Sequence, residues 1–383
     1  AVTGTNGKSS VADFYFQILK LNKKKVASIG TLGIKTQDYI KKVSNTTIDP
    51  IALSKCLKTL KKEKINDVIL EASSHGLKQN RLDGLKFKTG IFTNLSHDHL
   101  DYHKTFSDYL KSKLYLFEKL LIKNGNVITD VDISEYKKIS KIALKKKLNI
   151  QTISNNKGNL EIIYHKYHKE KQIVKIKYNK VFYKFETRLI GKIQIKNILM
   201  AMIAATKSSL SFKKVVNTID KLKPVSGRLE QIGSIKNNSK VILDYAHTPD
   251  ALEASLKCLK EQFKNSNISI VFGCGGDRDK AKRPMMGKIA NKYCDRVYLT
   301  DDNPRYEDPK SIRKSVRKNI NKSKTYEIPN RANAIDQAII DLKTGDILIV
   351  AGKGHEKIQE YKRVKKLFSD QEQILLSIKI KNK

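Results

Sequence analysis

The 383-residue sequence lacks several features that would assign it to a specialised class. It has no run of 18 or more apolar residues, so we expect no membrane-spanning helix and no membrane partner. The four cysteines, Cys56, Cys258, Cys274 and Cys294, form no C-x-x-C pair, which argues against a structural zinc or a disulfide framework. This cysteine usage is typical of a reducing compartment, and we expect a cytoplasmic protein.

Acidic residues are half as frequent as basic ones, 38 against 76, which gives a formal net charge of +38. Such an excess is typical of nucleic-acid-binding proteins. Here the lysines are dispersed along the whole chain and form no basic cluster with interleaved aromatic residues. We interpret the charge as a compositional bias and expect no nucleic-acid partner. A basic P-loop nucleic-acid-binding protein, with steeply salt-dependent binding, remains the alternative from another class.

The sequence does contain a series of short apolar runs separated by helix-like stretches. Runs rich in Val and Ile occupy residues 26–30, 68–73, 90–95, 241–247, 268–276, 296–302 and 346–356. Because these runs do not alternate with polar residues, they predict parallel strands buried on both faces. Most of them continue into Gly, Asp, Asn, His or Glu, where open α/β sheets keep their ligands. The sequence therefore predicts an α/β protein.

Two segments interrupt this alternation. Residues 160–190 resemble short antiparallel strands, and LKPVSGR (222–228) has the Pro, Ser and Gly of a linker. A new series of strands and helices follows the linker. We therefore predict two domains, 1–224 and 225–383.

The first residues, AVTGTNGKSS, contain a glycine-rich loop directly before a helix-like stretch. Backbone amides between Gly4 and Gly7 can bind phosphate oxygens, Lys8 can reach the terminal phosphates, and the Ser9 hydroxyl can bind Mg²⁺. The usual P-loop has four residues between its glycines, whereas this one has two. An incidental glycine-rich turn is the alternative, and the helix-like KSSVADFYFQILK that follows argues against it.

Further polar side chains follow two apolar runs. Glu71 directly follows the apolar residues 68–70, and a carboxylate beside a P-loop is well placed to bind Mg²⁺. The stretch FTNLSHDHLDYH (92–103) brings together Asn94, Asp98, His99 and Asp101. A histidine-rich loop could bind a transition metal, but no second ligand cluster accompanies it, so zinc is not expected.

Five stretches, in order, carry a family resemblance: TGTNGKS, EASSHGL, FTNLSHDHLDYH, DYAHTPDAL and GCGGDRDKAKRP. They resemble the Mur ligases, and among these the MurE type, over nearly the whole chain from Thr3 to about Glu356. The resemblance implies a central P-loop ATPase domain with a mostly parallel sheet and a small antiparallel region. A Rossmann-like C-terminal α/β domain, which binds the incoming amino acid, would follow it.

Mur ligases also carry an N-terminal domain that holds the UDP end of the substrate. We expect this domain to be missing here, so that the chain binds ATP yet uses the UDP-substrate poorly. We expect a monomer.

The resemblance implies an ATP-dependent amide ligase of peptidoglycan precursor synthesis. ATP would phosphorylate the D-Glu carboxylate of UDP-MurNAc-L-Ala-D-Glu, and an amine would attack the acyl phosphate, with catalysis coming mainly from positioning and charge neutralisation. A folylpolyglutamate-type ligase would share the ATP core. It should lack the stretch DDNPRYEDP (301–309) that this chain contains.

By resemblance, Lys8, Glu71, His99 and Lys113 are the expected catalytic residues, with Ser9, Glu71, His99 and a carbamylated Lys113 binding Mg²⁺. A surface lysine is the alternative for Lys113, and Lys111 lies two positions away. In the adenine-contacting segment, Ile193 and Gln194 depart from the family pattern. The expected ATP-binding residues are Gly4, Thr5, Asn6, Gly7, Lys8, Ser9, Ser10, Asn94, Asn197, Arg228, Asp244 and His247.

The two remaining substrates have their own expected residues. The nucleotide-dipeptide would be held by Asn45, Thr46, Thr47, Ser73, Gln79 and Arg81, whose donors suit carboxylates and sugar oxygens. The resemblance implies meso-diaminopimelate as the incoming amino acid, bound by Arg278, Asp302, Asn303, Pro304, Arg305, Gly352 and Glu356.

Arg305 is the residue that favours diaminopimelate over L-lysine, the substrate of the nearest alternative ligase. Diaminopimelate has a carboxylate at its far end, which a guanidinium can bind through two hydrogen bonds. Lysine lacks that group and would leave the guanidinium unpaired. Glu356 would pair with the distal ammonium.

Overall fold

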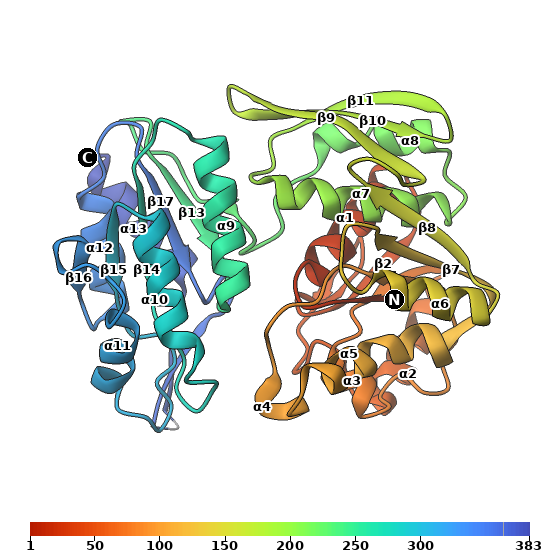
Figure 1. Cartoon of the computed structure of the whole chain (residues 1–383), viewed down its shortest axis with the longest axis horizontal. Coiled ribbons are helices and arrows are strands. Elements are labelled where there is room, and N and C mark those ends of the chain that lie inside the picture. The colour runs from red at the N-terminus through yellow and green to blue at the C-terminus, as the bar shows by residue number, and fades with distance from the viewer. Residues whose placement is uncertain (363) are drawn as a thin grey trace. The chain divides into compact units, whose positions relative to one another are not determined.

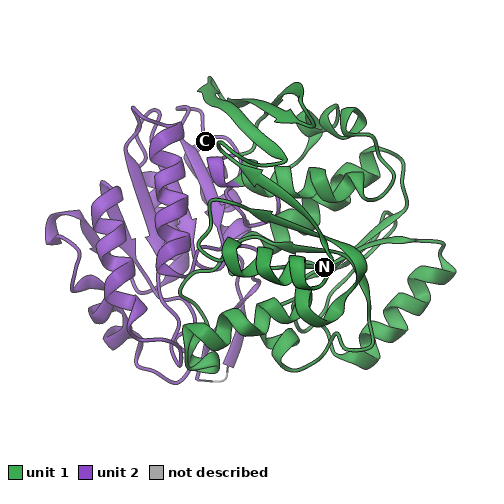
Figure 2. Cartoon of the chain, turned by 45° about the vertical axis from the view of Figure 1, so that its right-hand side comes forward, with its two compact units in different colours: residues 1–189, 194–223 green, residues 190–193, 224–383 purple. Residues whose placement is uncertain are grey.

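The computed structural model describes residues 1–362 and 364–383, and divides them into two compact units. Unit 1 comprises residues 1–189 and 194–223, and unit 2 comprises residues 190–193 and 224–383 (Figure 2). The division between Lys223 and Pro224 lies within the stretch LKPVSGR (222–228). Residues 190–193 belong to unit 2, although they include the first two residues of helix α7 (Lys192–Thr206), the rest of which belongs to unit 1.

Unit 1 alternates strands and helices before ending in antiparallel strands. Its strands are β1 (Val2–Thr3), β2 (Val26–Gly30), β3 (Gly33–Lys35), β4 (Ile40–Lys41), β5 (Asp67–Leu70), β6 (Phe87–Phe92), β7 (Leu121–Asp130), β8 (Asn149–Ser154), β9 (Leu160–His168), β10 (Lys171–Tyr178) and β11 (Val181–Thr187). Its helices are α1 (Lys8–Leu21), α2 (Pro50–Lys62), α3 (Ser74–Lys78), α4 (Leu100–His103), α5 (Phe106–Tyr115), α6 (Tyr136–Lys145), α7 (Lys192–Thr206) and α8 (Phe212–Val216).

In the described part of unit 1, these strands form a seven-stranded sheet of order β1-β6-β7-β8-β9-β10-β11 and a four-stranded sheet of order β4-β3-β2-β5. The pairs from β1 to β9 in the larger sheet are parallel, whereas β9, β10 and β11 are antiparallel. A bridge between Val2 and Glu71 joins the two sheets. The expected mostly parallel sheet with a small antiparallel region is therefore confirmed.

Apolar side chains of α2, α5 and α6 pack on these strands in one core that includes Leu53, Leu110, Ile139, Phe92 and Val127. Helix α7 is apolar on nearly all sides, and most of its residues are correspondingly buried. These packed elements fix the ends of β1, β5 and β6, where the expected phosphate-binding residues lie.

Unit 2 is a second α/β unit. Its strands are β12 (Glu230–Gln231), β13 (Lys240–Asp244), β14 (Ile268–Phe272), β15 (Arg296–Leu299), β16 (Thr325–Glu327), β17 (Ile347–Ala351), β18 (Ile358–Tyr361) and β19 (Val364–Leu367). Its helices are α9 (Pro249–Gln262), α10 (Lys282–Tyr293), α11 (Pro309–Arg317), α12 (Arg331–Ile340) and α13 (Asp370–Lys381).

Over its described residues, unit 2 has a six-stranded sheet of order β12-β13-β17-β14-β15-β16, in which only β12 is antiparallel to its neighbour. Helices α9, α10 and α11 cover one face and share a core with Ile242, Ile270 and Ile349. Helices α12 and α13 cover the other face, packing on Leu243 and Val350 (Figure 1). Neighbouring residues of one strand thus enter different cores, which explains why the runs are apolar without alternation. The expected Rossmann-like unit is confirmed.

Among the described residues, no helix combines the length and apolarity needed to cross a bilayer. The four cysteines are all free thiols, and Cys258, Cys274 and Cys294 are buried.

Candidate functional site

The glycine-rich loop of unit 1 joins the carboxyl end of β1 to the first turn of α1. Gly4 and Gly7 have φ angles of 145° and 85°, in the region that favours glycine. A Cβ atom on Gly4 would lie 1.9 Å from the Thr93 hydroxyl, and one on Gly7 would lie 2.6 Å from Oδ1 of Asn197. The loop therefore packs closely against β6 and α7, and neither glycine could carry a side chain without displacing a neighbour.

A second set of contacts holds the loop from the segment that follows β6. The backbone amide of Asn6 donates to Oδ1 of Asn94 at 2.9 Å, and the amide of Thr5 donates to the Asn94 carbonyl at 2.9 Å. The Thr5 hydroxyl also lies 3.0 Å from the hydroxyl of Tyr109 on α5. Asn94, expected at the ATP site, thus contacts the loop directly, whereas the Tyr109 contact was not predicted from the sequence.

Two lysine ammonium groups meet at the loop. Nζ of Lys8 donates to the carbonyl oxygens of Gly4 and Thr5, both at 2.9 Å, and Nζ of Lys113 donates to the same Gly4 oxygen at 2.8 Å. Lys113 is 1% exposed and lies 4.4 Å from the centre of the Tyr109 ring, whereas Lys111 is exposed on the same helix. The structure therefore places Lys113, and not Lys111, against the loop.

The surroundings of Lys113 change its ionisation. Burial is the main cause that lowers the pKa of the Lys113 ammonium well below its usual value, and the nearby positive charge of Lys8 acts in the same direction. An anion bound beside the two ammonium groups would reverse the second effect. This part of unit 1 is electrostatically suited to a phosphate-bearing ligand.

Ser9 and Glu71, the two residues predicted to bind Mg²⁺ beside the loop, are hydrogen-bonded to each other. Oγ of Ser9 donates to Oε2 of Glu71 at 2.9 Å, and Thr31 donates to the same carboxylate through its amide, at 2.9 Å, and its hydroxyl, at 3.2 Å. Glu71 is 2% exposed. A hydroxyl and a carboxylate are the hard oxygen donors that Mg²⁺ prefers, so these two residues fit that ion.

His99, the third residue predicted to bind Mg²⁺, contacts Asp98 and His75. It has a left-handed backbone, with φ 54°, and its Nε2 lies 3.4 Å from Oδ2 of Asp98. Burial lowers the pKa of His99 to about 4, so it is neutral near pH 7. Its ring packs at 4.8 Å from that of His75. Within the described residues, no three His, Cys, Asp or Glu side chains group around a metal position. That His99 binds Mg²⁺ together with Glu71 remains a prediction.

The residues expected to hold the nucleotide-dipeptide form one connected group and several separate contacts. The Thr47 hydroxyl donates to the Glu71 carbonyl at 2.8 Å and to the Ser73 hydroxyl at 3.0 Å, and Nη1 of Arg81 donates to the Thr47 carbonyl at 2.7 Å. Thr46 contacts Thr31. The structure thus links this group to the Glu71 carboxylate.

Two further residues of this set, Gln79 and Asn45, and Asn197 of the expected ATP-binding set have other contacts. Gln79 donates to the Tyr102 hydroxyl at 3.1 Å, and Asn45 is bonded to Ser44 near the surface. Oε1 of Gln194 accepts a hydrogen bond from Nδ2 of Asn197 at 3.0 Å, so these two side chains of α7 are bonded to each other.

In unit 2, the expected nucleotide residues surround the carboxyl end of β13. Asp244 is 5% exposed and accepts hydrogen bonds from the amides of Leu229 and Tyr245 and from the Ser255 hydroxyl. Burial raises the pKa of Asp244, and these bonds oppose that rise. The Arg228 guanidinium lies 4.3 Å from the centre of the Tyr245 ring. Nδ1 of His247 lies 2.9 Å from the Tyr245 carbonyl.

The stretch DDNPR follows β15 and meets the loop that follows β17. Nη1 of Arg305 donates to the Gly276 carbonyl at 2.7 Å, and its Nε lies 3.8 Å from the Glu360 carboxylate. Arg305 has a φ angle of 52°, which is uncommon for a residue with a side chain. Nδ2 of Asn303 donates to Oε2 of Glu356 at 3.4 Å.

The other expected residues of this set lie around the same loops. A Cβ atom on Gly352 would lie 2.9 Å from Oδ2 of Asp302, and one on Gly276 would lie 1.9 Å from the Pro304 carbonyl. Arg278 is exposed in the loop after β14. The backbone segments of this set are therefore packed directly against one another.

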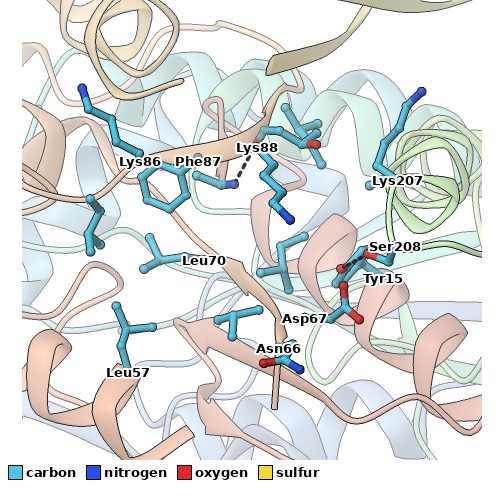
Figure 3. A pocket seen from close by; sticks show the side chains of 17 residues that line it. Tyr15, Leu57, Asn66, Asp67, Leu70, Lys86, Phe87, Lys88, Lys207 and Ser208 are labelled. Atoms are coloured by element: carbon cyan, nitrogen blue, oxygen red, sulfur yellow. Dashed lines mark hydrogen bonds between the residues drawn. The ribbon is translucent and has the colours of Figure 1, made fainter. Parts of the chain in front are cut away.

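A separate cavity of about 330 Å³ in unit 1 contains none of the expected site residues. It lies at the amino ends of β5 and β6, whereas the phosphate-binding loop follows the carboxyl end of β1. Figure 3 shows Asp67, Lys86 and Lys88 at this cavity, with the hydrogen bond between Tyr15 and Ser208.

Together, a glycine-rich loop beside a hydroxyl–carboxylate pair in unit 1 and a second α/β unit with charged side chains in the loops after its strands fit the class of ATP-dependent ligases. Two family models match the chain, the Mur ligase middle domain over residues 2–205 and the "Mur ligase, glutamate ligase domain" over residues 227–354. The chain belongs to the Mur ligase family.

Its relatives are similar over most of their length. A protein of Rickettsia rickettsii named UDP-N-acetylmuramoyl-L-alanyl-D-glutamate--2,6-diaminopimelate ligase is 42% identical over 99% of this chain and 79% of its own. A protein of the same name from Agrobacterium fabrum is 40% identical over 98% of this chain and 76% of its own.

Solved structures show the same similarity. That of a ligase with the same name has a TM-score of 0.70 and 33% identity, and covers 99% of this chain and 77% of its own. A folylpolyglutamate synthase of Mycobacterium tuberculosis has a TM-score of 0.73 at 16% identity, over 92% of this chain and 87% of its own, and shows the fold alone.

Proposed function

We propose that this protein is an ATP-dependent ligase that adds meso-diaminopimelate to UDP-MurNAc-L-Ala-D-Glu in peptidoglycan precursor synthesis. The main support is the 42% identity, over 99% of this chain, to a relative named for this reaction. Arg305 within the stretch DDNPR adds a physical reason, since its guanidinium suits the distal carboxylate of diaminopimelate.

In this mechanism, the glycine-rich loop and Lys8 bind the phosphates of ATP through backbone amides and an ammonium group. Ser9 and Glu71 would hold Mg²⁺, which neutralises charge on the phosphates when it is bound. Thr47, Ser73 and Arg81 hold the acceptor, so that its D-Glu carboxylate can attack the terminal phosphate. The bond to the leaving ADP breaks as the acyl phosphate forms.

In the second step, the amine of diaminopimelate attacks the acyl carbon, and phosphate leaves as the amide bond forms. Arg305 and Arg278 would bind the distal carboxylate, and Glu356 the distal ammonium. Arg228, Asp244 and His247 of unit 2 would contact the nucleotide. Each contact acts mainly by orienting a reacting group.

Lys113 has a proposed role as a carbamate, formed when its amine bonds to CO₂ and releases a proton. Its burial against the Gly4 carbonyl supports this role, because the modified group would lie beside the phosphates and the Mg²⁺ ligands. Electron density at Nζ tests it. Density for an unmodified amine in a structure with ATP and Mg²⁺ bound would contradict it.

We also propose that the protein is a cytoplasmic monomer that binds neither nucleic acid nor a membrane. A cytoplasmic location suits a reaction that consumes ATP. Light scattering of the purified chain tests whether it is a monomer. A filter-binding assay with DNA and RNA at low salt tests the proposed absence of nucleic-acid binding.

The decisive experiment measures phosphate release by the 383-residue chain with ATP, Mg²⁺, UDP-MurNAc-L-Ala-D-Glu and either amino acid. We expect release with meso-diaminopimelate and a kcat/KM at least about 100-fold lower with L-lysine, because lysine leaves Arg305 unpaired. Reactions lacking one substrate are the controls. Turnover with lysine and none with diaminopimelate would contradict the proposed substrate.

A further inference from the structure

The Lys353 side chain is fully buried among the residues proposed to hold the incoming amino acid. It follows β17, is 0% exposed, and its Nζ donates to Oδ1 of Asn303 at 3.2 Å, Oε2 of Glu356 at 3.3 Å and the Ile358 carbonyl at 2.6 Å. An ammonium group has three donors, and three acceptors surround this one. A buried charge of this kind is stable only when it is paired and hydrogen-bonded, as it is here by Glu356.

The first consequence concerns the side-chain amide of Asn303. Its Oδ1 accepts hydrogen bonds from Lys353 and from the Glu360 amide at 3.0 Å, so two donors determine which end of the amide is the oxygen. Its Nδ2 therefore lies on the other side, 3.4 Å from Glu356. An amide nitrogen has two donor hydrogens, and one bond to Glu356 leaves a second donor for a ligand.

The second consequence concerns the Glu356 carboxylate. Its Oε2 accepts from Lys353 and Asn303, and its Oε1 accepts from the Tyr245 hydroxyl at 3.3 Å. The side chain is 35% exposed, so the carboxylate also reaches solvent. A carboxylate has about four acceptor positions, and it can therefore keep these partners and accept from a ligand ammonium.

The loop that carries Lys353 is held by its surroundings. Nη2 of Arg331 donates to the Ala351 carbonyl at 2.9 Å, and the same guanidinium forms two hydrogen bonds of 2.7 Å to the buried Asp370. Gly352, with φ 111°, brings the loop close to Asp302. The ammonium of Lys353 is therefore fixed in position relative to Asn303.

We propose that Lys353 is a positioning residue that prepares the pocket for the charged end of an amino acid. Its ammonium group directs the nitrogen of Asn303 toward a ligand carboxylate and holds Glu356 as an acceptor for a ligand ammonium. Lys353 does not itself contact the ligand, because its three donors are all used within the protein. This inference rests on the proposed function, which assigns the pocket to diaminopimelate.

The variant Lys353→Met tests this role, since it keeps the aliphatic part of the side chain and removes the ammonium group. We expect the KM for meso-diaminopimelate to rise about 10- to 100-fold, as for the loss of a hydrogen bond to a charged group, with the KM for ATP unchanged. Lys357→Met is the matched control, because Lys357 is exposed and pairs with the exposed Glu372. Unchanged KM values in Lys353→Met would overturn the proposal.

Two further variants distinguish the proposed positioning role of Lys353 from a purely structural one. They are Glu356→Gln and the double variant with Lys353→Met and Glu356→Gln. Lys353→Met leaves the Glu356 carboxylate without its buried counter-charge, so adding Glu356→Gln should recover part of the lost thermal stability. Because Glu356 is itself proposed to bind diaminopimelate, the KM is judged in Lys353→Met alone, where it should stay raised at temperatures far below the unfolding transition of the variant. A wild-type KM at temperatures where Lys353→Met is fully folded would show that Lys353 serves folding only.

These measurements also distinguish failure of the inference from failure of the proposed function. A wild-type chain that turns over L-lysine and not diaminopimelate contradicts the proposed function. The thermal unfolding cycle needs no turnover, and absence of coupling between Lys353 and Glu356 in that cycle overturns the inference by itself.

Discussion

The two units use positive charge in different ways. In unit 1, the ammonium groups of Lys8 and Lys113 donate to the same carbonyl oxygen, that of Gly4. In unit 2, cations in and beside the loops after β14 and β17 are paired with carboxylates, as Lys353 is with Glu356 and Arg283 is with Glu307. One unit brings like charges together at a loop, and the other pairs opposite charges among its loops.

This difference corresponds to the ligand proposed for each unit. Two neighbouring ammonium groups repel each other, and this repulsion is relieved when a phosphate binds beside Lys8 or when the Lys113 amine becomes the proposed carbamate, whose negative charge attracts Lys8 and Mg²⁺. A pocket with paired charges presents donors and acceptors together, which suits a zwitterionic amino acid. The comparison predicts that charge removal in unit 1 affects turnover, whereas charge removal in unit 2 affects amino-acid binding.

The largest expected effect is on Lys113. Lys113→Ala should lower kcat about 10²- to 10³-fold, because it removes a charged group that stabilises the phosphoryl-transfer step. Steady-state kinetics with saturating substrates measures this change. Lys111→Ala is the matched control, since Lys111 is exposed on the same helix, and it should keep wild-type activity. Equal losses in both variants would contradict the assignment to Lys113.

A smaller effect, confined to one substrate, is expected at Arg305. Arg305→Ala should raise the KM for meso-diaminopimelate about 100-fold and leave the KM for ATP unchanged, because the distal carboxylate loses its guanidinium partner. Arg305→Lys should restore little, since an ammonium cannot form the two parallel hydrogen bonds. A fall in kcat at unchanged KM would remove the contrast between the two units.

Gly30→Ala tests the oxygen-ligand pair of unit 1 without changing a polar residue. A Cβ atom on Gly30 would lie 2.1 Å from Oε1 of Glu71, so the carboxylate must move. We expect a loss of about 1–3 kcal/mol in unfolding free energy, as for overpacking, and a higher Mg²⁺ requirement for activity. Gly84→Ala, at a position with φ 84° and open space, should cost stability without changing the Mg²⁺ requirement.

The smallest effect is expected at the Arg283–Glu307 pair of unit 2. Two hydrogen bonds from Arg283 are the main cause that lowers the pKa of Glu307 from its usual 4.5 to about 2. Because the folded-state pKa is lowered, the stabilisation is present above pH 4.5 and is lost as the pH falls toward 2.

Glu307→Gln should therefore cost about 1 kcal/mol near pH 7, after solvent screening, and the difference from wild type should vanish near pH 2. Denaturant unfolding at several pH values measures it. A difference that is independent of pH would contradict the ionic origin of the pair.

Local patterns predicted much of the fold. The apolar runs at 26–30, 268–276 and 346–356 contain the strands β2, β14 and β17, and the boundary of the two units lies within LKPVSGR. These features could be predicted because burial on both faces of a sheet leaves a composition that is visible within a few residues. The glycine-rich loop was visible for a similar reason, since its backbone conformation requires glycine at fixed positions.

The sequence by itself indicated the α/β class, several of the strands, the glycine-rich loop before a helix and the family resemblance. Tertiary structure alone decided which distant side chains meet: Thr31 with Glu71, Tyr109 with Thr5, and Lys353 with Asn303. It also distinguished Lys113 from Lys111, because the packing of α5 buries one face and exposes the other. Contacts between residues far apart in the chain depend on how the whole core packs, and local composition carries no record of that packing.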